Sequence, residues 1–189
     1  MSSEDAIEGQ AAVENAIVGF LRSLGSKRAE GLFHERVEGS ISRNFELVFL
    51  KEEMFLAPTE LVKFSEGMNG LVYVGMRRGR ISGKIFIPAP SFLEDLKPFI
   101  DELNYAVLND KASWLFLCGR DALPNGISRL NLPDPTAGRL ALVFNSGMEC
   151  LGYGRIEKNG EGDVWIRNLF DLGDFLRRED KKEERRKRQ

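Results

Sequence analysis

The residues best suited to chemistry in this sequence are basic ones interleaved with glycine. Residues 75–84 read GMRRGRISGK, and no acidic residue occurs between positions 71 and 93. Glycine lets a backbone approach a phosphate closely, and nearby cations can then bind that phosphate. We therefore interpret four residues as candidate nucleic-acid contacts: Arg77, Arg78, Arg80 and Lys84. The alternative is a solvated hairpin turn whose arginines only keep a sheet edge soluble.

Catalytic motifs do not accompany these cations. A nucleotide-binding P-loop would need glycine at position 78 and Ser or Thr at position 85, where the chain has Arg78 and Ile85. The single histidine, His34, has no second histidine with which to build a metal site or a Ser/His/Asp triad. We predict that the protein is not an enzyme, needs no cofactor and binds no metal.

A second group of cations lies in the C-terminal half, where Arg155, Lys158 and Arg167 fall on or beside two predicted adjacent strands. Strand alternation puts Arg167 on the same face as Trp165. An arginine in that position is either a half-buried side chain with its charged end in water or the neighbour of a stacked base. We include all three cations among the candidate RNA contacts.

The net charge of −2 conceals an uneven distribution. Residues 1–105 carry 12 basic and 16 acidic side chains, residues 106–176 carry 7 and 9, and residues 177–189 carry 8 and 4. A broad, uniformly basic surface is therefore excluded, and any RNA binding must depend on local patches. The basic tail, which begins at Arg177, is either a solvated extension or an arm that orders on RNA. We include Arg177 among the candidate contacts.

Membrane insertion is not expected, because the longest apolar runs are far shorter than the roughly 20 residues that cross a bilayer. The first residues lack the basic and apolar regions of a signal peptide. We predict a cytoplasmic protein without membrane contact, or a nucleolar one if the source is eukaryotic.

Hydrophobic periodicity and turn signals predict the elements of the N-terminal half. We expect an amphipathic helix over residues 10–24, paired strands over 45–50 and 54–57, and a short helix capped by Thr59. Strands over residues 71–74 and 84–87 should flank the basic segment, which then forms a link. A capping box of Ser91 and Glu94 should open a helix that runs to about residue 103 and is bent or cut short by Pro98.

The C-terminal half predicts mostly short strands. A strand begins at Tyr105, a helix covers residues 112–118, and residues 139–144 and 148–156 form a hairpin. A further strand covers residues 164–169, and a helix capped by Asp171 follows. These patterns predict an α+β protein with an N-terminal α/β domain over residues 1–105, which contains a small antiparallel sheet. They also place a second domain at residues 106–178 and a charged tail at residues 179–189.

Several motifs of the second half resemble a known family. They are WLFLCGRD at residues 114–121, NGI at 125–127, the Gly152-x-Gly154 strand, and NLFDLGDFLR at 168–177. Together they resemble the C-terminal PUA domain of the nuclear-import-protein-seven family of ribosome biogenesis factors, and its archaeal branch in particular. The similarity covers residues 71–178, whereas residues 1–70 agree only in the order and length of their elements.

The resemblance implies a PUA-type mixed β-barrel over residues 106–178 and a non-catalytic protein that binds ribosomal RNA. It also implies a preference for uridine-rich single strands, a role in maturation of the large ribosomal subunit, and other ribosome assembly factors as partners. Basic positions of the family's RNA-binding strand correspond here to Arg167, but others correspond to Asp163, Val164 and Phe170. Arg155, Lys158, the segment from Arg77 to Lys84 and the tail are then the compensating candidates.

Two other functions remain open. The protein could be a docking adaptor in a ribosome assembly complex, with an acidic N-terminal face that meets a basic partner and with weak RNA affinity. It could also be an accessory part of an RNA-modifying enzyme, although no cofactor motif or nucleophile constellation supports that function.

Overall fold

The computed structural model describes residues 3–33 and 44–174, with side chains from residue 11 onward within those ranges. The chain divides into two compact units, residues 1–98 and residues 99–189, which are described separately. The predicted boundary between residues 105 and 106 falls inside the second unit. The amide of Asn131 donates to the carbonyl oxygens of Asp101 and Leu103 and thereby ties residues 99–104 to the C-terminal sheet.

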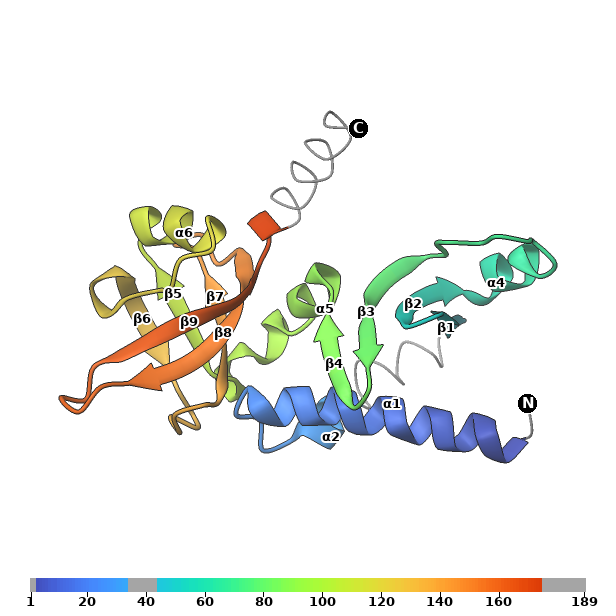
Figure 1. Ribbon diagram of the computed structural model, residues 1–189, viewed down its shortest axis with the longest axis horizontal. Helices are drawn as coiled ribbons and strands as arrows, with labels where there is room; N and C mark the ends of the chain where they lie inside the picture. Colours follow the sequence, from blue (N-terminus) through green and yellow to red (C-terminus); the bar gives the residue numbers. More distant parts are fainter. Residues whose placement is uncertain (1–2, 34–43, 175–189) are drawn as a thin grey trace, which may run out of the picture. The chain divides into compact units, whose positions relative to one another are not determined.

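The first unit is a four-stranded antiparallel sheet with helices packed against it (Figure 1). The strands follow one another in chain order, and the predicted hairpin of residues 45–57 is confirmed as β1 and β2. The elements are α1 (Ser3–Ser23), α2 (Ala29–Phe33), β1 (Phe45–Leu50), β2 (Glu53–Pro58), α4 (Thr59–Ser65), β3 (Met76–Ser82), β4 (Ile85–Pro88) and α5 (Pro90–Glu94).

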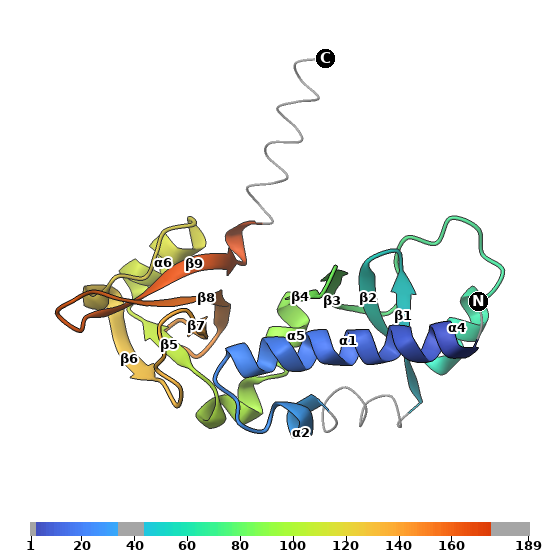
Figure 2. The same cartoon turned by 60° about the horizontal axis from the view of Figure 1, so that its bottom comes forward.

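Aromatic side chains fasten α1 to the sheet. The rings of Phe20 in α1, Phe86 in β4 and Phe92 in α5 meet edge to face, with centroid separations of 4.9 to 6.3 Å. Such arrangements stabilise beyond the area they bury. Figure 2 shows α1 running along the unit with α2 beside it. The predicted amphipathic helix is thus confirmed, and its apolar face forms the core on this side of the sheet.

The strand predicted at residues 71–74 is wrong, because the strand of this region is β3, which contains the basic segment itself. Gly75 has a φ of 66°, and a Cβ there would lie 2.5 Å from the carbonyl oxygen of Leu56. This glycine turns the chain into β3 at a point where no side chain fits. Residues 71–74 have no regular structure, although Val74 is buried against Phe55.

Two predicted helix caps also differ. Thr59 is the first residue of α4, and the capping position belongs to Pro58, which has no side-chain hydrogen bond to offer. Ser91 does not cap α5, because its hydroxyl donates to the carbonyl oxygen of Arg77. The helix expected to reach residue 103 ends at Glu94, and a 3-10 helix, η2 (Lys97–Glu102), with non-helical dihedrals at Phe99, follows.

The second unit is a five-stranded sheet in the order β6-β5-β7-β8-β9. The pairing of β5 with β7 is parallel and the other pairings are antiparallel. The hairpin predicted over residues 139–156 is confirmed as β7 and β8. The elements are β5 (Tyr105–Leu108), α6 (Asp110–Leu117), the 3-10 helix η3 (Pro124–Gly126), β6 (Ile127–Asn131), β7 (Leu140–Phe144), β8 (Cys150–Lys158) and β9 (Val164–Asp171).

This sheet is not closed, so the predicted barrel is wrong in that respect. Closure would require β6 to pair with β9, and within the described residues those two strands stand at opposite ends of the sheet order. The outer edge of β9 is occupied instead by Ala122, which exchanges two backbone hydrogen bonds of 2.9 Å with Ile166. The connection after α6 therefore blocks the edge that a barrel would use.

The core of the second unit lies between α6 and one face of the sheet. Phe116 of α6 is fully buried against Leu108, Val143 and Ile156. Two thiols differ in exposure, since Cys150 in β8 is buried and Cys118 at the end of α6 is exposed. The helix predicted from Leu172 extends beyond the described residues.

Within these residues, no helix is long and apolar enough to span a membrane.

Candidate nucleic-acid interface

The basic segment of the first unit is a strand with a bulge. Met54 of β2 stands opposite Gly79, and the next residue, Phe55, stands opposite Arg77, so that Arg78 is the extra residue in β3. A bulge of this kind bends a strand and changes where its side chains point. The three arginines of β3 therefore have different surroundings and cannot act as one uniform patch.

Arg78 is buried, with only 4% of its surface exposed. Its guanidinium forms an ion pair of 2.5 Å with Asp95 and lies 5.5 Å from the ring centroid of Phe92. A cation with these partners anchors α5 to the sheet and is not accessible to a phosphate. The interpretation of Arg78 as an RNA contact is therefore withdrawn. Arg77, which is partly exposed, forms an ion pair with Glu53 of β2.

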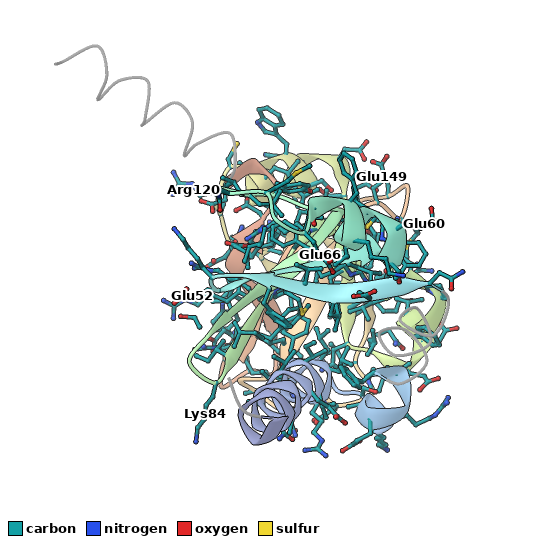
Figure 3. The ribbon with its side chains drawn as sticks, turned by 90° about the vertical axis from the view of Figure 1, so that its right-hand side faces the viewer. Glu52, Glu60, Glu66, Lys84, Arg120 and Glu149 are labelled. Carbon is teal, nitrogen blue, oxygen red and sulfur yellow. The ribbon has the colours of Figure 1, made fainter. Side chains whose placement is uncertain are left out.

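Arg80 and Lys84 are the more accessible cations of this segment. Arg80 is half-buried and stands between Glu53 and Ile87 in the sheet register. Lys84 is exposed and follows Gly83 in the turn between β3 and β4, where Figure 3 shows it at the tip of the hairpin. Both stay candidate contacts, although the Glu53 carboxylate reduces the positive potential around Arg77 and Arg80.

The cations of the second unit lie on the antiparallel pair of β8 and β9. Arg155 stands directly opposite Arg167, and both side chains are exposed. Trp165, which is half-buried, shares their face of the sheet and stands opposite Glu157. Side chains directly opposite each other on antiparallel strands are close neighbours, so two arginines there repel each other. We call Arg155, Trp165 and Arg167 the β8–β9 surface.

Phe170, an alternative stacking residue, already has an aromatic partner. Its ring stacks on that of Tyr153 with centroids 5.7 Å apart and an interplanar angle of 22°. Trp165 is therefore the better candidate for stacking on a base. The bulge between Asn168 and Phe170 changes the register of β9, so Phe170 stands opposite Tyr153 while Asn168 stands opposite Gly154.

Lys158 stands at the end of β8, where it is exposed and opposite Val164. The turn that follows is ordered by Asn159, whose side-chain oxygen accepts from the backbone N–H groups of Glu161 and Asp163. Its amide also donates to the Asp163 carboxylate at 3.0 Å. By strand alternation Lys158 lies at the end of β8 on the face opposite to that of Arg155 and Arg167. Arg177 and the tail lie outside the described residues.

Sequence reasoning missed a shallow groove of about 330 Å³ in this unit. It lies where residues 127–130 of β6 face the turn before β9, including Asp163. Arg129 contributes to its lining and lies with its guanidinium carbon 5.4 Å from the ring centroid of Tyr105. No spacing in the sequence indicates this groove, because the sheet brings together segments that are about 35 residues apart.

Two further features of the described residues concern clustered metal ligands and perturbed carboxyl groups. No group of three or more His, Cys, Asp or Glu side chains there could hold a metal ion. One carboxyl group is perturbed: hydrogen bonds from Thr136, and secondarily the charge of Arg139, hold the pKa of Asp134 below its usual value. These contacts stabilise the connection between β6 and β7.

Comparison with known proteins gives one family match, in which residues 104–180 match the family model described as the UPF0113 PUA domain. No curated protein is significantly similar to the chain. The match supports a PUA domain over these residues of the C-terminal unit, and PUA domains bind RNA as a class.

The solved structures that match this chain include three with TM-scores below 0.5. A hypothetical protein from the archaeon Pyrococcus horikoshii OT3 is 15% identical, with 91% of this chain and 94% of that chain covered and a TM-score of 0.47. A conserved PUA-domain protein from Thermoplasma acidophilum is 18% identical, with coverages of 75% and 90% and a TM-score of 0.47. A PUA domain from Aeropyrum pernix K1, solved as a tartrate complex, is 15% identical, with coverages of 80% and 85% and a TM-score of 0.41.

Proposed function

We propose that this protein is a non-catalytic RNA-binding factor that holds the phosphates of single-stranded RNA on its β8–β9 surface. The observation that supports this most directly is the placement of Arg155 opposite Arg167. A sheet selected for stability alone would favour opposite charges at such a position. A phosphate that binds both guanidinium groups turns this repulsion into two attractive contacts.

Trp165 gives the same surface a means of holding a base. It shares the face of both arginines, and its indole can stack on any unpaired base, because every base has a π-face. Sequence-tolerant stacking beside a few phosphate contacts is the chemistry of single-strand binding rather than of duplex recognition. Lys158 is a further cation of the same unit, whereas Arg80 and Lys84 are separate candidate contacts in the first unit.

We further propose that the RNA is ribosomal, that uridine-rich stretches are preferred, and that the protein acts in maturation of the large ribosomal subunit with other assembly factors. The support is the resemblance of residues 114–121 and 168–177 to the nuclear-import-protein-seven family. A protein with this function works where subunits assemble, which is the cytoplasm, or the nucleolus of a eukaryotic cell.

The test is binding of a fluorescently labelled uridine-rich RNA of 12 nucleotides, followed by anisotropy at low salt. Arg155→Glu and Arg167→Glu should each weaken binding by about tenfold, because each loses a phosphate contact and adds a repulsive charge. Lys51→Glu is the matched control, since Lys51 is an exposed cation of the β1–β2 turn with the same change of charge. It should leave the affinity nearly unchanged.

A protein-docking adaptor is the second candidate function. It is favoured by the apolar side chains that α4 exposes in an acidic part of the first unit. Absence of binding to uridine-rich RNA at low salt would contradict the RNA-binding proposal and favour the adaptor. Equal weakening by Lys51→Glu and Arg167→Glu would show that RNA responds only to overall charge and not to the β8–β9 surface.

A further inference from the structure

The helix α4 and the loop after it expose several large apolar side chains. Phe64 is 72% exposed and Val72 is 83% exposed, while Leu61 and Met68 are exposed to 39% and 48%. Single exposed apolar residues are common, but a contiguous set usually marks an interaction surface. We call these four residues, Leu61, Phe64, Met68 and Val72, the α4 patch.

Leu61, Phe64 and Met68 follow one another along α4 and the turn after it. Leu61 and Phe64 are three residues apart and lie on one side of α4, whereas Val62 points to the core that contains Phe55. Met68 follows the helix end within one turn of chain.

The loop keeps Val72 on the outside. Leu71 packs against the same core, and the ring of Tyr73 meets that of Phe55 edge to face, with centroids 4.9 Å apart. Tyr73 makes this contact although it is itself 59% exposed, and Val72, between Leu71 and Tyr73, faces solvent. Leu71 and Tyr73 therefore contribute to the packing of this unit, whereas the exposed side chains of the α4 patch do not.

The charges on α4 and on the residue after it are mostly acidic. Residues 59–66 contain Glu60 and Glu66 and one basic residue, Lys63. Glu60 lies one helical turn before Phe64, and Glu66 lies two residues after it. Figure 3 shows both glutamates beside α4. Phosphate groups would be repelled here, so RNA is not the natural occupant.

We propose that the α4 patch is a docking site for a basic amphipathic segment of a partner protein. The apolar side of that segment covers Phe64 and its neighbours, and its lysines or arginines meet Glu60 and Glu66. Electrostatic complementarity of this kind speeds encounter and excludes acidic partners. A second copy of this chain fits less well, because two surfaces with an excess of glutamate would repel each other.

The probe for this proposal is a labelled 14-residue peptide of leucine and lysine with leucine at helical spacing, titrated with the full-length protein. Phe64→Ser should weaken binding at least about tenfold, because it removes the most exposed apolar group of the patch. Glu60→Lys with Glu66→Lys should weaken binding of this peptide and strengthen binding of the equivalent leucine and glutamate peptide. Phe64 and both glutamates are exposed, so these variants should fold normally.

The controls are Leu115→Ser and Glu161→Lys, which replace an exposed apolar side chain and an exposed glutamate in the second unit. Both should bind the basic peptide as the unmodified protein does. The proposal is overturned if Phe64→Ser binds the peptide normally, or if a lysine-only peptide of equal charge binds as tightly. It is also overturned if sedimentation shows a dimer that Phe64→Ser dissociates, since the occupant is then a second copy.

Discussion

At the scale of single residues, the role of a charged side chain depends on partners that are distant in sequence. The segment around Arg77 and Arg78 contains no acid of its own, yet Glu53 and Asp95 neutralise these two arginines in the fold. Sequence could identify the cations, but it could not show which of them stay accessible. The predicted candidates that the structure leaves exposed are Arg155, Arg167, Lys158 and Lys84.

Asn104 is a buried residue that sequence reasoning gave no role. Its side-chain amide donates to the carbonyl oxygens of Asp134 and Leu140, and its oxygen accepts from the N–H group of Asp134. The side chain therefore fixes the start of β5 to the connection before β7. Nothing in the local sequence distinguishes it from a surface asparagine, because all its partners lie about 30 or more residues away.

Asn104→Ala should lower the free energy of unfolding by about 3 kcal/mol, because three hydrogen bonds are lost and buried backbone groups are left without partners. Thermal unfolding followed by circular dichroism measures the change. Asn125→Ala, at an exposed asparagine whose side chain makes no hydrogen bond that stabilises the sheet, serves for comparison and should cost far less. A loss below 1 kcal/mol for Asn104→Ala would show that water replaces these contacts.

At the scale of elements, local patterns predicted the hairpins well and the basic segment badly. Both predicted hairpins have apolar strands on either side of a clear turn signal. They lie at residues 45–58 and 139–156, and both form the expected antiparallel pairs. Residues 76–82 have few apolar side chains, so periodicity predicted a link. They form β3 because it pairs with β2 on one side and with β4 on the other, which satisfies the hydrogen-bonding capacity of its backbone N–H and C=O groups. This stabilisation does not require apolar side chains.

Two glycines in β8 bring it close to β9. Gly152 has a φ of 149°, and a Cβ there would lie 2.0 Å from the carbonyl oxygen of Phe170. At Gly154 a Cβ would lie 2.3 Å from the carbonyl oxygen of Arg167. The sequence showed the Gly-x-Gly spacing but not its purpose, which is the close approach of the strand that carries Arg167.

Gly152→Ala should lower the free energy of unfolding by about 3 kcal/mol or more, since it combines backbone strain with overpacking against β9. The control is Gly160→Ala, where a Cβ meets nothing within 4 Å and φ is not positive. Urea unfolding curves of the two variants provide the comparison. Similar midpoints for both would mean that β9 moves aside without cost, and RNA binding by Gly152→Ala would then show whether Arg155 still faces Arg167.

At the scale of the whole molecule, the net charge of −2 limits how RNA can be bound. No uniform positive field surrounds the chain, so attraction depends on the few cations that are locally in excess. Residues 106–176 contain seven basic and nine acidic residues, and only on the β8–β9 surface do two arginines stand side by side in the sheet register. Composition predicted this dependence on patches, whereas the location of the patch required the pairing of β8 with β9.

The salt dependence of RNA binding should therefore be shallow. If Arg155, Lys158 and Arg167 each hold one phosphate, log K should fall by about 2 for each unit of log salt concentration, at about 0.7 per contact. Anisotropy titrations over a series of potassium chloride concentrations measure this slope. A slope near zero would contradict phosphate binding by these cations. A slope near 3.5 would mean that Arg80 and Lys84 also contribute.

The unequal exposure of the two thiols has a consequence for kinetics. A thiol reagent reaches Cys118 in the native protein, but it reaches Cys150 only when β8 separates from its neighbours. The reaction of Cys118 can therefore be completed quickly. The reaction of Cys150 then proceeds at a rate that depends on how often β8 opens. The wild-type chain thus contains its own reporter for the opening of the strand that carries Arg155, and the rate can be compared with and without RNA.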